Sequence, residues 1–221
     1  MGDMIDIEFF QAYLTRLEQK RIRFSTKYGD KKPFAEDTIA SEFAEQILLE
    51  HQANNGLTLE TEVHNEPIQP NIGRFFWIDM IIKDNNNPVF VAEFKFKWNR
   101  GKYSQRFGRC MKDLIKLHIY RHLYDPANCQ IGLILVWNGD MENSIYNVAD
   151  AQVYNGLFAG PVVQFNIVNN DYNATFRQSY ERLVNNLQAQ LIIQDHPTLS
   201  YSIQHVHNVG QDLHLRFLRL I

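Results

Sequence analysis

The chain has 221 residues, of which 45% are hydrophobic and 21% are charged, and its formal net charge is −3. These values are typical of a globular protein with a real core, and they exclude a disordered or fibrous chain. No apolar run approaches the roughly 20 residues that a membrane helix needs, and the acidic first ten residues are unlike a secretory signal, so no membrane partner is expected. Two cysteines, Cys110 and Cys129, do not make a disulfide framework, which favours a reducing cytosol.

Positive charge is concentrated in two windows of the sequence. Residues 95–121 hold nine Lys or Arg and one acid, Asp113, so this window is +8 and the rest of the chain is −11. Residues 16–32 hold seven basic residues against Glu18 and Asp30. Such asymmetry is an electrostatic footprint for a polyanion that the small net charge hides, and a solvated helix face is the alternative.

The first half of the chain predicts two helices followed by three strands. Apolar spacing predicts helices over residues 4–24 and 36–52, with a loop between them that ends at Pro33. Alternating and β-branched runs predict strands over residues 57–64, 74–82 and 88–98. The last two are joined by KDNNNP, which has the composition of a turn.

The second half begins with a long helix over about residues 103–124, which Asp125 and Pro126 end. The continuous apolar run 130–137 predicts a strand buried on both faces. The remaining expected elements are a helix over 142–154, a strand over 162–168, a helix over 172–193 and a C-terminal hairpin around Gly210.

The element order is therefore α-β-β-β-α-β with additions at both ends, which predicts an α/β domain with a central mixed sheet flanked by helices. We expect a core over residues 33–170, preceded by an N-terminal helix and loop over 1–32. Residues 171–221 are expected to form a C-terminal helix and a β-hairpin that pack on the same domain.

Two of the predicted strands bring acids and a lysine to one face. Side chains alternate along a strand, so Glu93 and Lys95 share a face that a row of Phe residues backs on the other side. If the strands form an antiparallel hairpin about Asn86, paired positions sum to 172 and Asp79 lies opposite Glu93. Their Cβ atoms are then about 4.5–5.5 Å apart. Two carboxylates at that distance repel each other unless a cation lies between them.

A hard divalent cation such as Mg²⁺ resolves this conflict, because it prefers oxygen ligands and keeps several waters. The carbonyl of Phe94 would add a third protein ligand. Lys95 would stand beside a metal-bound water, where it helps to hold or deprotonate the nucleophile or neutralises a phosphate oxygen. This combination suits phosphodiester hydrolysis. The alternative is that Asp79, Glu93 and Lys95 form a surface ion-pair cluster on a half-exposed sheet.

Asp79, followed fourteen residues later by Glu93-Phe94-Lys95 on a second strand, resembles the motif of the PD-(D/E)xK nuclease superfamily. The element order over roughly residues 36–137 is similar to the restriction-endonuclease-like αβββαβ core, although Ile78 stands where the family usually has Pro. The resemblance implies a Mg²⁺-dependent DNA endonuclease of the restriction, defence or repair type, with Mn²⁺ as a substitute ion. In it Asp79 and Glu93 bind the metal, and Lys95 acts on the attacking water.

The family often adds an acid from the first core helix. Glu36 projects near the apolar stripe of that helix and is therefore our candidate for a further metal ligand. Glu42 and Glu45 project away from the stripe, so we expect them to face solvent. The alternative for Glu36 is a structural role, since the helix dipole favours an acid in the first turn.

The helix after the motif lies beside the active site in the family and often contacts the nucleic-acid backbone. Basic residues recur along it at spacings of three and four, largely on its polar side. Phosphate contact by such a row is sequence-independent and sensitive to salt. The predicted contacts to double-stranded DNA are Lys97, Arg100, Lys102, Arg106, Arg109, Lys112 and Lys116.

Three other functions stay open from the sequence. They are a catalytically silent nucleic-acid-binding module of the same fold, an RNA-directed nuclease, and an interaction protein whose acidic remainder binds a basic partner. A homodimer would suit cleavage of two strands, which calls for two sites. His118 and His122 have the spacing of a zinc pair without a third ligand. His205 and His207 are expected at the surface, with a role toward DNA as the alternative.

Overall fold

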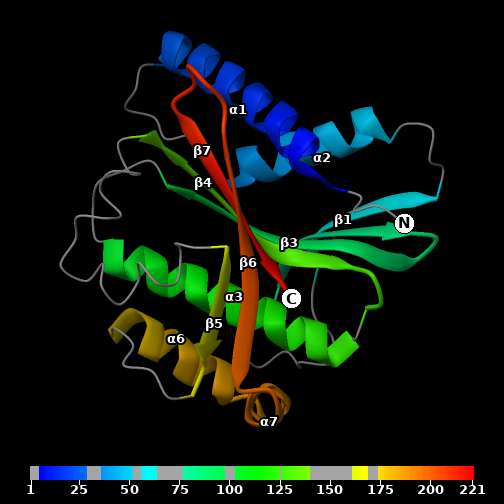
Figure 1. Ribbon diagram of the computed structural model, residues 1–221, viewed down its shortest axis with the longest axis vertical. Coiled ribbons are helices and arrows are strands. Elements are labelled where there is room, and N and C mark those ends of the chain that lie inside the picture. The colour runs from blue at the N-terminus through cyan, green and yellow to red at the C-terminus, as the bar shows by residue number, and fades with distance from the viewer. Residues whose placement is uncertain are drawn as a thin grey trace.

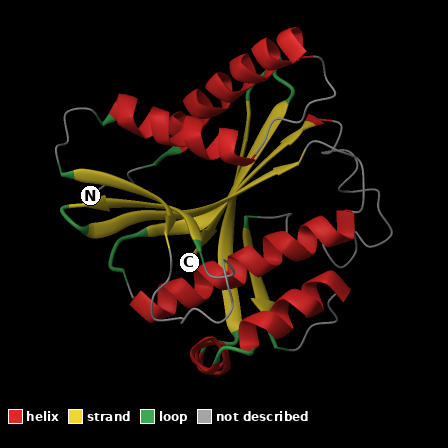
Figure 2. Ribbon diagram, turned by 180° about the vertical axis from the view of Figure 1, so that it is seen from behind, coloured by secondary structure: helices red, strands yellow, loops and turns green. Residues whose placement is uncertain are grey.

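The computed structural model describes residues 5–28, 36–51, 56–63, 77–97, 103–124, 126–139, 161–168 and 174–221. A seven-stranded sheet runs through the molecule between two layers of helices (Figure 1). Figure 2 shows the same layers from behind, with helices on both faces of the sheet. No helix within these ranges has the length and apolar character needed to cross a membrane.

The sheet is mixed, as predicted, and the protein is therefore of the mixed α/β type. Its helices are α1 (Ile7–Tyr28), α2 (Glu36–Glu50), α3 (Tyr103–Tyr124), α6 (Ala174–Val184) and α7 (Leu187–Asp195). Its strands are β1 (Leu57–Val63), β2 (Ile78–Asp84), β3 (Asn87–Lys97), β4 (Gln130–Asn138), β5 (Val162–Asn166), β6 (Thr198–His207) and β7 (Leu213–Leu220). The strand order is β1-β2-β3-β4-β7-β6-β5, and β3 and β4 are the parallel pair. The sheet is larger than the expected core because β7, β6 and β5 extend it beyond β4.

Alternation along β3 and β4 sorts their side chains between two cores. Phe90 and Phe94 of β3 pack with Phe43 of α2, and the ring centroids of each pair are 5.3 Å apart. Val91 of β3 and Leu133 of β4 pack on the opposite face, in the core that contains α3. All of β4 is buried, as its continuous apolar run predicts.

A two-residue turn fixes the register between β2 and β3. Asn85 and Asn86 have φ angles of 48° and 67°, the left-handed values of the hairpin turn that matches strand twist and that Asn tolerates. Met80 pairs with Ala92, so the predicted sum of 172 is confirmed. Nearer the turn, a bulge after Ile82 shifts the pairing by one residue.

The C-terminal hairpin is confirmed and lies inside the sheet rather than at its edge. Strand β7 pairs with both β4 and β6, and Gly210, at a φ of +80°, lies in the connection between β6 and β7. A Cβ atom at Gly132 of β4 would lie 2.4 Å from the carbonyl oxygen of Leu218. Glycine at this position therefore allows the close approach of β7.

Three predicted helices differ from the structure or cannot be compared with it. The single helix expected over residues 172–193 is two helices, because Asn186 caps α7 by accepting a hydrogen bond from the Ala189 N–H at 3.0 Å. The first helix extends to Tyr28. The helix expected over residues 142–154 lies outside the described residues.

Candidate active site

Asp79 and Glu93 lie opposite each other on β2 and β3, as the register predicts. Glu93 Oε1 accepts a hydrogen bond from the Asp79 backbone N–H at 3.3 Å, and Asp79 Oδ2 accepts one from the Phe94 N–H at 2.8 Å. Each carboxylate therefore binds the backbone of the other strand, which fixes one of its two oxygens.

Lys95 joins this pair from the next position of β3 that points to the same face. Its Nζ lies 2.9 Å from the Phe94 carbonyl oxygen, 3.2 Å from Asp113 Oδ2 and 3.5 Å from Glu36 Oε2. Glu36 begins α2, so it is the first-helix acid that reaches the site. The three residues Asp79, Glu93 and Lys95 thus converge with Glu36.

Helix α3 adds two residues that the sequence did not assign to the site. Lys116 Nζ contacts Glu93 Oε1, donates a hydrogen bond to the Trp77 carbonyl oxygen at 2.7 Å, and lies 3.7 Å from Asp113 Oδ1. The side chains of Glu93 and Asp113 are 1% exposed and that of Lys116 is 4% exposed. Removing a charge from water costs several kcal/mol unless it is paired, so these buried groups depend on one another.

The buried cluster contains more carboxylates than ammonium groups. Lys112 Nζ lies 3.0 Å from Asp113 Oδ1, so three lysines surround this one acid. Among the described side chains, the cluster consists of the acids Glu36, Asp79, Glu93 and Asp113 and the cations Lys95, Lys112 and Lys116. One negative charge is left over only when all four acids are ionised, including Glu93.

The two buried acids respond differently to this environment. Burial raises the pKa of Glu93 to about 8; Asp113 and Asp79 add to the rise, whereas Lys116 and Lys95 oppose it. Burial also disfavours the charge on Asp113, but the three lysines outweigh it and hold the pKa of this carboxyl well below its usual range. Glu93 is therefore the acid that gains most from a further cation.

The lysines stay charged at neutral pH. Burial disfavours the ammonium form of Lys95, but the carboxylates of Asp113, Glu93 and Glu36 outweigh it and raise its pKa well above the usual range. The pKa of Lys116 is raised in the same way, mainly by Glu93 and Asp113. Neither lysine is thus a free base in this arrangement.

The donor set fits one hard divalent ion. Asp79 Oδ1 and Glu93 Oε2 make no hydrogen bond or ion pair with the described residues, and Phe94 directly follows Glu93 in β3. Mg²⁺ is usually bound by one or two carboxylates and completes its shell with water and substrate phosphates. No group of three or more His, Cys, Asp or Glu side chains in the described ranges could hold a metal. Glu36 and Asp113 face lysines, so Asp79 and Glu93 are the two carboxylates left for an ion.

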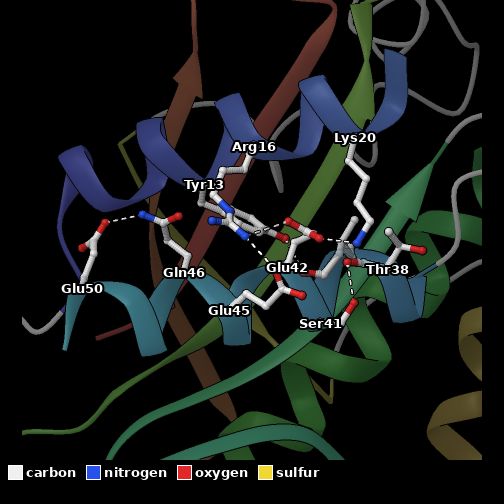
Figure 3. A network of polar contacts seen from close by, with 10 residues as sticks. Tyr13, Arg16, Lys20, Thr38, Ser41, Glu42, Glu45, Gln46 and Glu50 are labelled. Atoms are coloured by element: carbon white, nitrogen blue, oxygen red, sulfur yellow. Dashed lines mark hydrogen bonds and ion pairs between the residues drawn. The ribbon is translucent and has the colours of Figure 1, made fainter. Parts of the chain in front are cut away.

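The expectation that Glu42 faces solvent is wrong. Figure 3 shows Glu42 between α2 and α1, where it contacts Lys20 and lies 3.3 Å from Arg16 Nη2. Its side chain is 7% exposed, because α1 packs over this part of α2. Glu45 is 57% exposed, as expected, and its Oε2 forms an ion pair with Arg16 Nη2 at 2.7 Å. Both acids belong to the junction of the two helices and not to the site.

The predicted nucleic-acid contacts separate into two groups. Arg109 is exposed and Lys112 is half-buried on α3, whereas the placement of Lys116 on the polar side of the helix is wrong. Its ammonium is buried against Glu93 and is not available to a phosphate at the surface. Predicted contacts whose side chains lie outside the described part are Lys97, Arg100, Lys102 and Arg106.

Two of the four histidines noted in the sequence, His118 and His122, contact the segment after α7. His118 Nε2 lies 2.9 Å from the His196 carbonyl oxygen, and the His122 ring stacks on the His196 ring at 3.7 Å. They hold α3 to the segment after α7, and no zinc ligand set is present among the described residues. His205 and His207 are exposed, as expected.

No family model matches the chain, and no curated protein or solved structure matches it. The arrangement of Asp79, Glu93 and Lys95 is therefore the observation from which a function is argued.

Proposed function

We propose that the protein is a Mg²⁺-dependent DNA endonuclease of the PD-(D/E)xK type. The observation that carries the proposal is the convergence of Asp79, Glu93 and Lys95 on two adjacent strands, beside the buried Asp113 and Lys116 of α3. The order α2-β1-β2-β3-α3-β4, with β3 and β4 parallel, agrees with the αβββαβ core of that superfamily. The three additional strands lie beyond β4, away from this pair.

In this proposal Asp79 and Glu93 hold the ion through the oxygens that the strand backbone leaves unused, and the Phe94 carbonyl adds a third ligand. When bound, Mg²⁺ polarises a phosphate oxygen and lowers the pKa of a bound water. Glu36 contacts Lys95 in the metal-free arrangement, so its proposed role shifts from metal ligand to partner of the lysine.

Lys95 acts as a cation rather than as a general base. Its pKa is raised by the surrounding carboxylates, so it does not accept a proton from water near neutral pH. The ammonium instead donates a hydrogen bond to the attacking water or to a phosphate oxygen and stabilises the charge that develops there. Its contacts with the Phe94 carbonyl and Asp113 fix its position beforehand.

Duplex DNA is the proposed substrate because the basic side of α3 adjoins the cluster. Arg109 of this helix is exposed. Lys112, on the same helix, forms an ion pair with Asp113 of the cluster. Contacts of this kind bind phosphates without reading the base sequence, and they weaken as salt rises.

One observation favours a second candidate, a catalytically silent nucleic-acid-binding module. Lys116 forms an ion pair with Glu93, one of the two proposed metal ligands. A protein that kept this ion pair permanently would bind duplex DNA through its basic helix and would not cut it.

The test is cleavage of supercoiled plasmid and linear duplex in Mg²⁺ or in EDTA. We expect cutting by the wild type in Mg²⁺ alone, and Lys95→Ala to lower the rate on the order of 10²–10³-fold, because one stabiliser of developing charge is lost. Lys83→Ala is the matched control, since Lys83 pairs with Glu60 of β1 at 2.7 Å and takes no part in the cluster.

Each outcome of the cleavage assay selects one function. Salt-sensitive duplex binding without cutting would support the silent module. Cutting of RNA but not DNA would identify an RNA-directed nuclease. Neither cutting nor binding would leave a structural ion cluster and would contradict the proposal.

A further inference from the structure

The proposed mechanism does not use Lys116, the most deeply buried cation among the described residues. Lys116 projects from the middle of α3 into the cluster, and its side chain is 4% exposed. A buried ammonium of this kind is rare in proteins unless it is fully paired. The groups that pair with the Lys116 ammonium therefore indicate which kind of cation this position suits.

Three oxygens from three parts of the chain surround the Lys116 ammonium. They are Glu93 Oε1 from β3, the Trp77 carbonyl oxygen at 2.7 Å, and Asp113 Oδ1 at 3.7 Å. Two carboxylates and a backbone carbonyl form the kind of oxygen set that binds a hard divalent ion. The ammonium thus occupies a cation position beside the one proposed for Mg²⁺, with Glu93 shared between the two.

We propose that Lys116 is a protein-borne cation that takes the place of a second metal, so that the site binds one divalent ion per chain. This inference rests on the proposed metal-dependent function and specifies its cofactor stoichiometry. In two-metal phosphodiester hydrolysis the ions lie about 3.5–4 Å apart and share a carboxylate. Glu93 is the carboxylate available for sharing, and Lys116 holds one of its oxygens.

The lysines around Asp113 disfavour binding of a second divalent ion by its carboxylate. Its two oxygens face Lys95 at 3.2 Å, Lys112 at 3.0 Å and Lys116 at 3.7 Å. A divalent ion bound to Asp113 would lie within a few ångström of three ammonium groups, and the repulsion is strong at such distances in a buried site. Of the three lysines, Lys116 is the one that also contacts Glu93 and the Trp77 carbonyl, so it alone occupies the position between these groups and Asp113.

The charge of the cluster leads to the same stoichiometry. When a metal ion binds and all four acids are ionised, the described side chains leave one negative charge over, because four carboxylates face three ammonium groups. One divalent ion and one phosphodiester, which carries a single negative charge, bring the buried site to neutrality. A second divalent ion would leave two uncompensated positive charges.

The experiment counts Mn²⁺ bound to the full chain without nucleic acid, by isothermal titration and by electron paramagnetic resonance. The wild type is expected to bind one Mn²⁺ with the spectrum of an isolated ion. Lys116→Ala, which removes the ammonium and opens its space, is expected to bind two Mn²⁺ whose spectra are coupled. Lys112→Ala is the matched control, because it removes a charge next to Asp113 without freeing Glu93, and it is expected to bind one.

The possible results separate the inference from the function on which it rests. Two coupled Mn²⁺ ions in the wild type, or a single ion in folded Lys116→Ala, would overturn the inference and leave metal-dependent cleavage intact. No Mn²⁺ in the wild type would overturn the metal-dependent function and the inference with it. If Lys116→Ala does not fold, the wild-type count decides, and Lys116→Gln, which keeps a donor toward Trp77 and removes the charge, replaces the alanine variant.

Discussion

Two clusters of charged side chains lie on opposite faces of the sheet, and they are built differently. The first joins α1 to α2, where Arg16 and Lys20 contact Glu42 and Arg16 also contacts Glu45 (Figure 3). Two cations face two carboxylates there. The Arg16 side chain is 30% exposed and that of Lys20 is 43% exposed, so both cations keep much of their water.

The second cluster lies between β2, β3 and α3, and its cations are less exposed, at 13% for Lys95 and 21% for Lys112, although Glu36 at its edge is 44% exposed. Its acids Glu93 and Asp113 and its cation Lys116 are almost fully buried. It also uses the backbone, because Asp79 and Glu93 accept hydrogen bonds from N–H groups of the opposite strands. Unlike the first cluster it holds more acids than cations among the described residues.

This difference shows how a structural ion cluster is distinguished from a candidate active site. Balanced charges with exposed cations join two helices at small energetic cost. Unbalanced charges in a buried position are costly, and they persist when an additional ion or substrate completes them. The following predictions test that distinction.

The largest expected effect is on the buried cluster. Asp113→Asn should lower the free energy of unfolding by about 3–5 kcal/mol, because it leaves buried ammonium groups without their shared carboxylate. Chemical denaturation measures this loss. Asp195→Asn, at an exposed carboxylate, is the control and should change stability by less than about 0.5 kcal/mol. A similarly small loss in Asp113→Asn would show that the buried cluster contributes no more to stability than an exposed carboxylate does.

The α3 face should also be the more sensitive to acid. Burial lowers the pKa of His118 to about 4, and nearby positive charge adds to this, although its hydrogen bond to the His196 carbonyl opposes it. A histidine in the unfolded chain has a pKa near 6.5. Between pH 6.5 and 4, His118 is therefore protonated in the unfolded chain and neutral in the folded chain. The contribution of His118 to stability should therefore be constant above pH 6.5 and fall by about 3 kcal/mol as pH drops from 6.5 to 4.

Unfolding free energies across this pH range test the prediction. His118→Gln should lose less stability on acidification than the wild type does, because its side chain does not titrate. His207→Gln, at an exposed position, should follow the wild type. Identical curves for wild type and His118→Gln would refute the assignment.

Metal should distinguish the two clusters directly. At ten times its Kd, Mg²⁺ should stabilise the wild type by about 1.4 kcal/mol, since it binds the folded form only. Asp79→Asn should lose this stabilisation, and Glu42→Gln should keep it. Thermal unfolding in Mg²⁺ and in EDTA measures both, and a response that survives Asp79→Asn would place the ion elsewhere.

The smallest effect is expected at the helix junction. Glu42→Gln should cost about 1 kcal/mol of unfolding free energy, because its cations are partly hydrated and the amide still accepts a hydrogen bond. The loss should shrink further in high salt, where ion pairs of partly exposed cations are screened. A cost as large as that of Asp113→Asn would show that exposure of the cations does not matter.

The sequence predicted those features that depend on local periodicity. Alternation along residues 88–98 placed Glu93 and Lys95 on one face, and the predicted pairing sum of 172 brings Asp79 opposite Glu93, although a bulge after Ile82 is needed to reach that register from the turn. The continuous apolar run of β4 likewise predicted a strand buried on both faces. In each case the repeat of the strand itself determines the outcome.

Features that depend on a distant partner were missed. The burial of Glu42 follows from the docking of α1, which the periodicity of α2 does not record. Lys116 was predicted to contact phosphate from the polar side of α3, whereas it and Asp113 are buried against Glu93 and Lys95 of β3. The signal available in the sequence was that Asp113 is the single acid in a window of nine basic residues.

The position of β7 between β4 and β6 has a consequence for the nascent chain. Leu213, where β7 begins, follows Asn138 at the end of β4 by 75 residues. At a synthesis rate of about 5–20 residues per second, one edge of β4 stays unpaired for roughly 4–15 s before β7 is made. That edge belongs to a strand without a charged residue, so during synthesis it is an open template for other strands. Growth at low temperature or with chaperones that cover apolar strands should therefore raise the yield of folded protein.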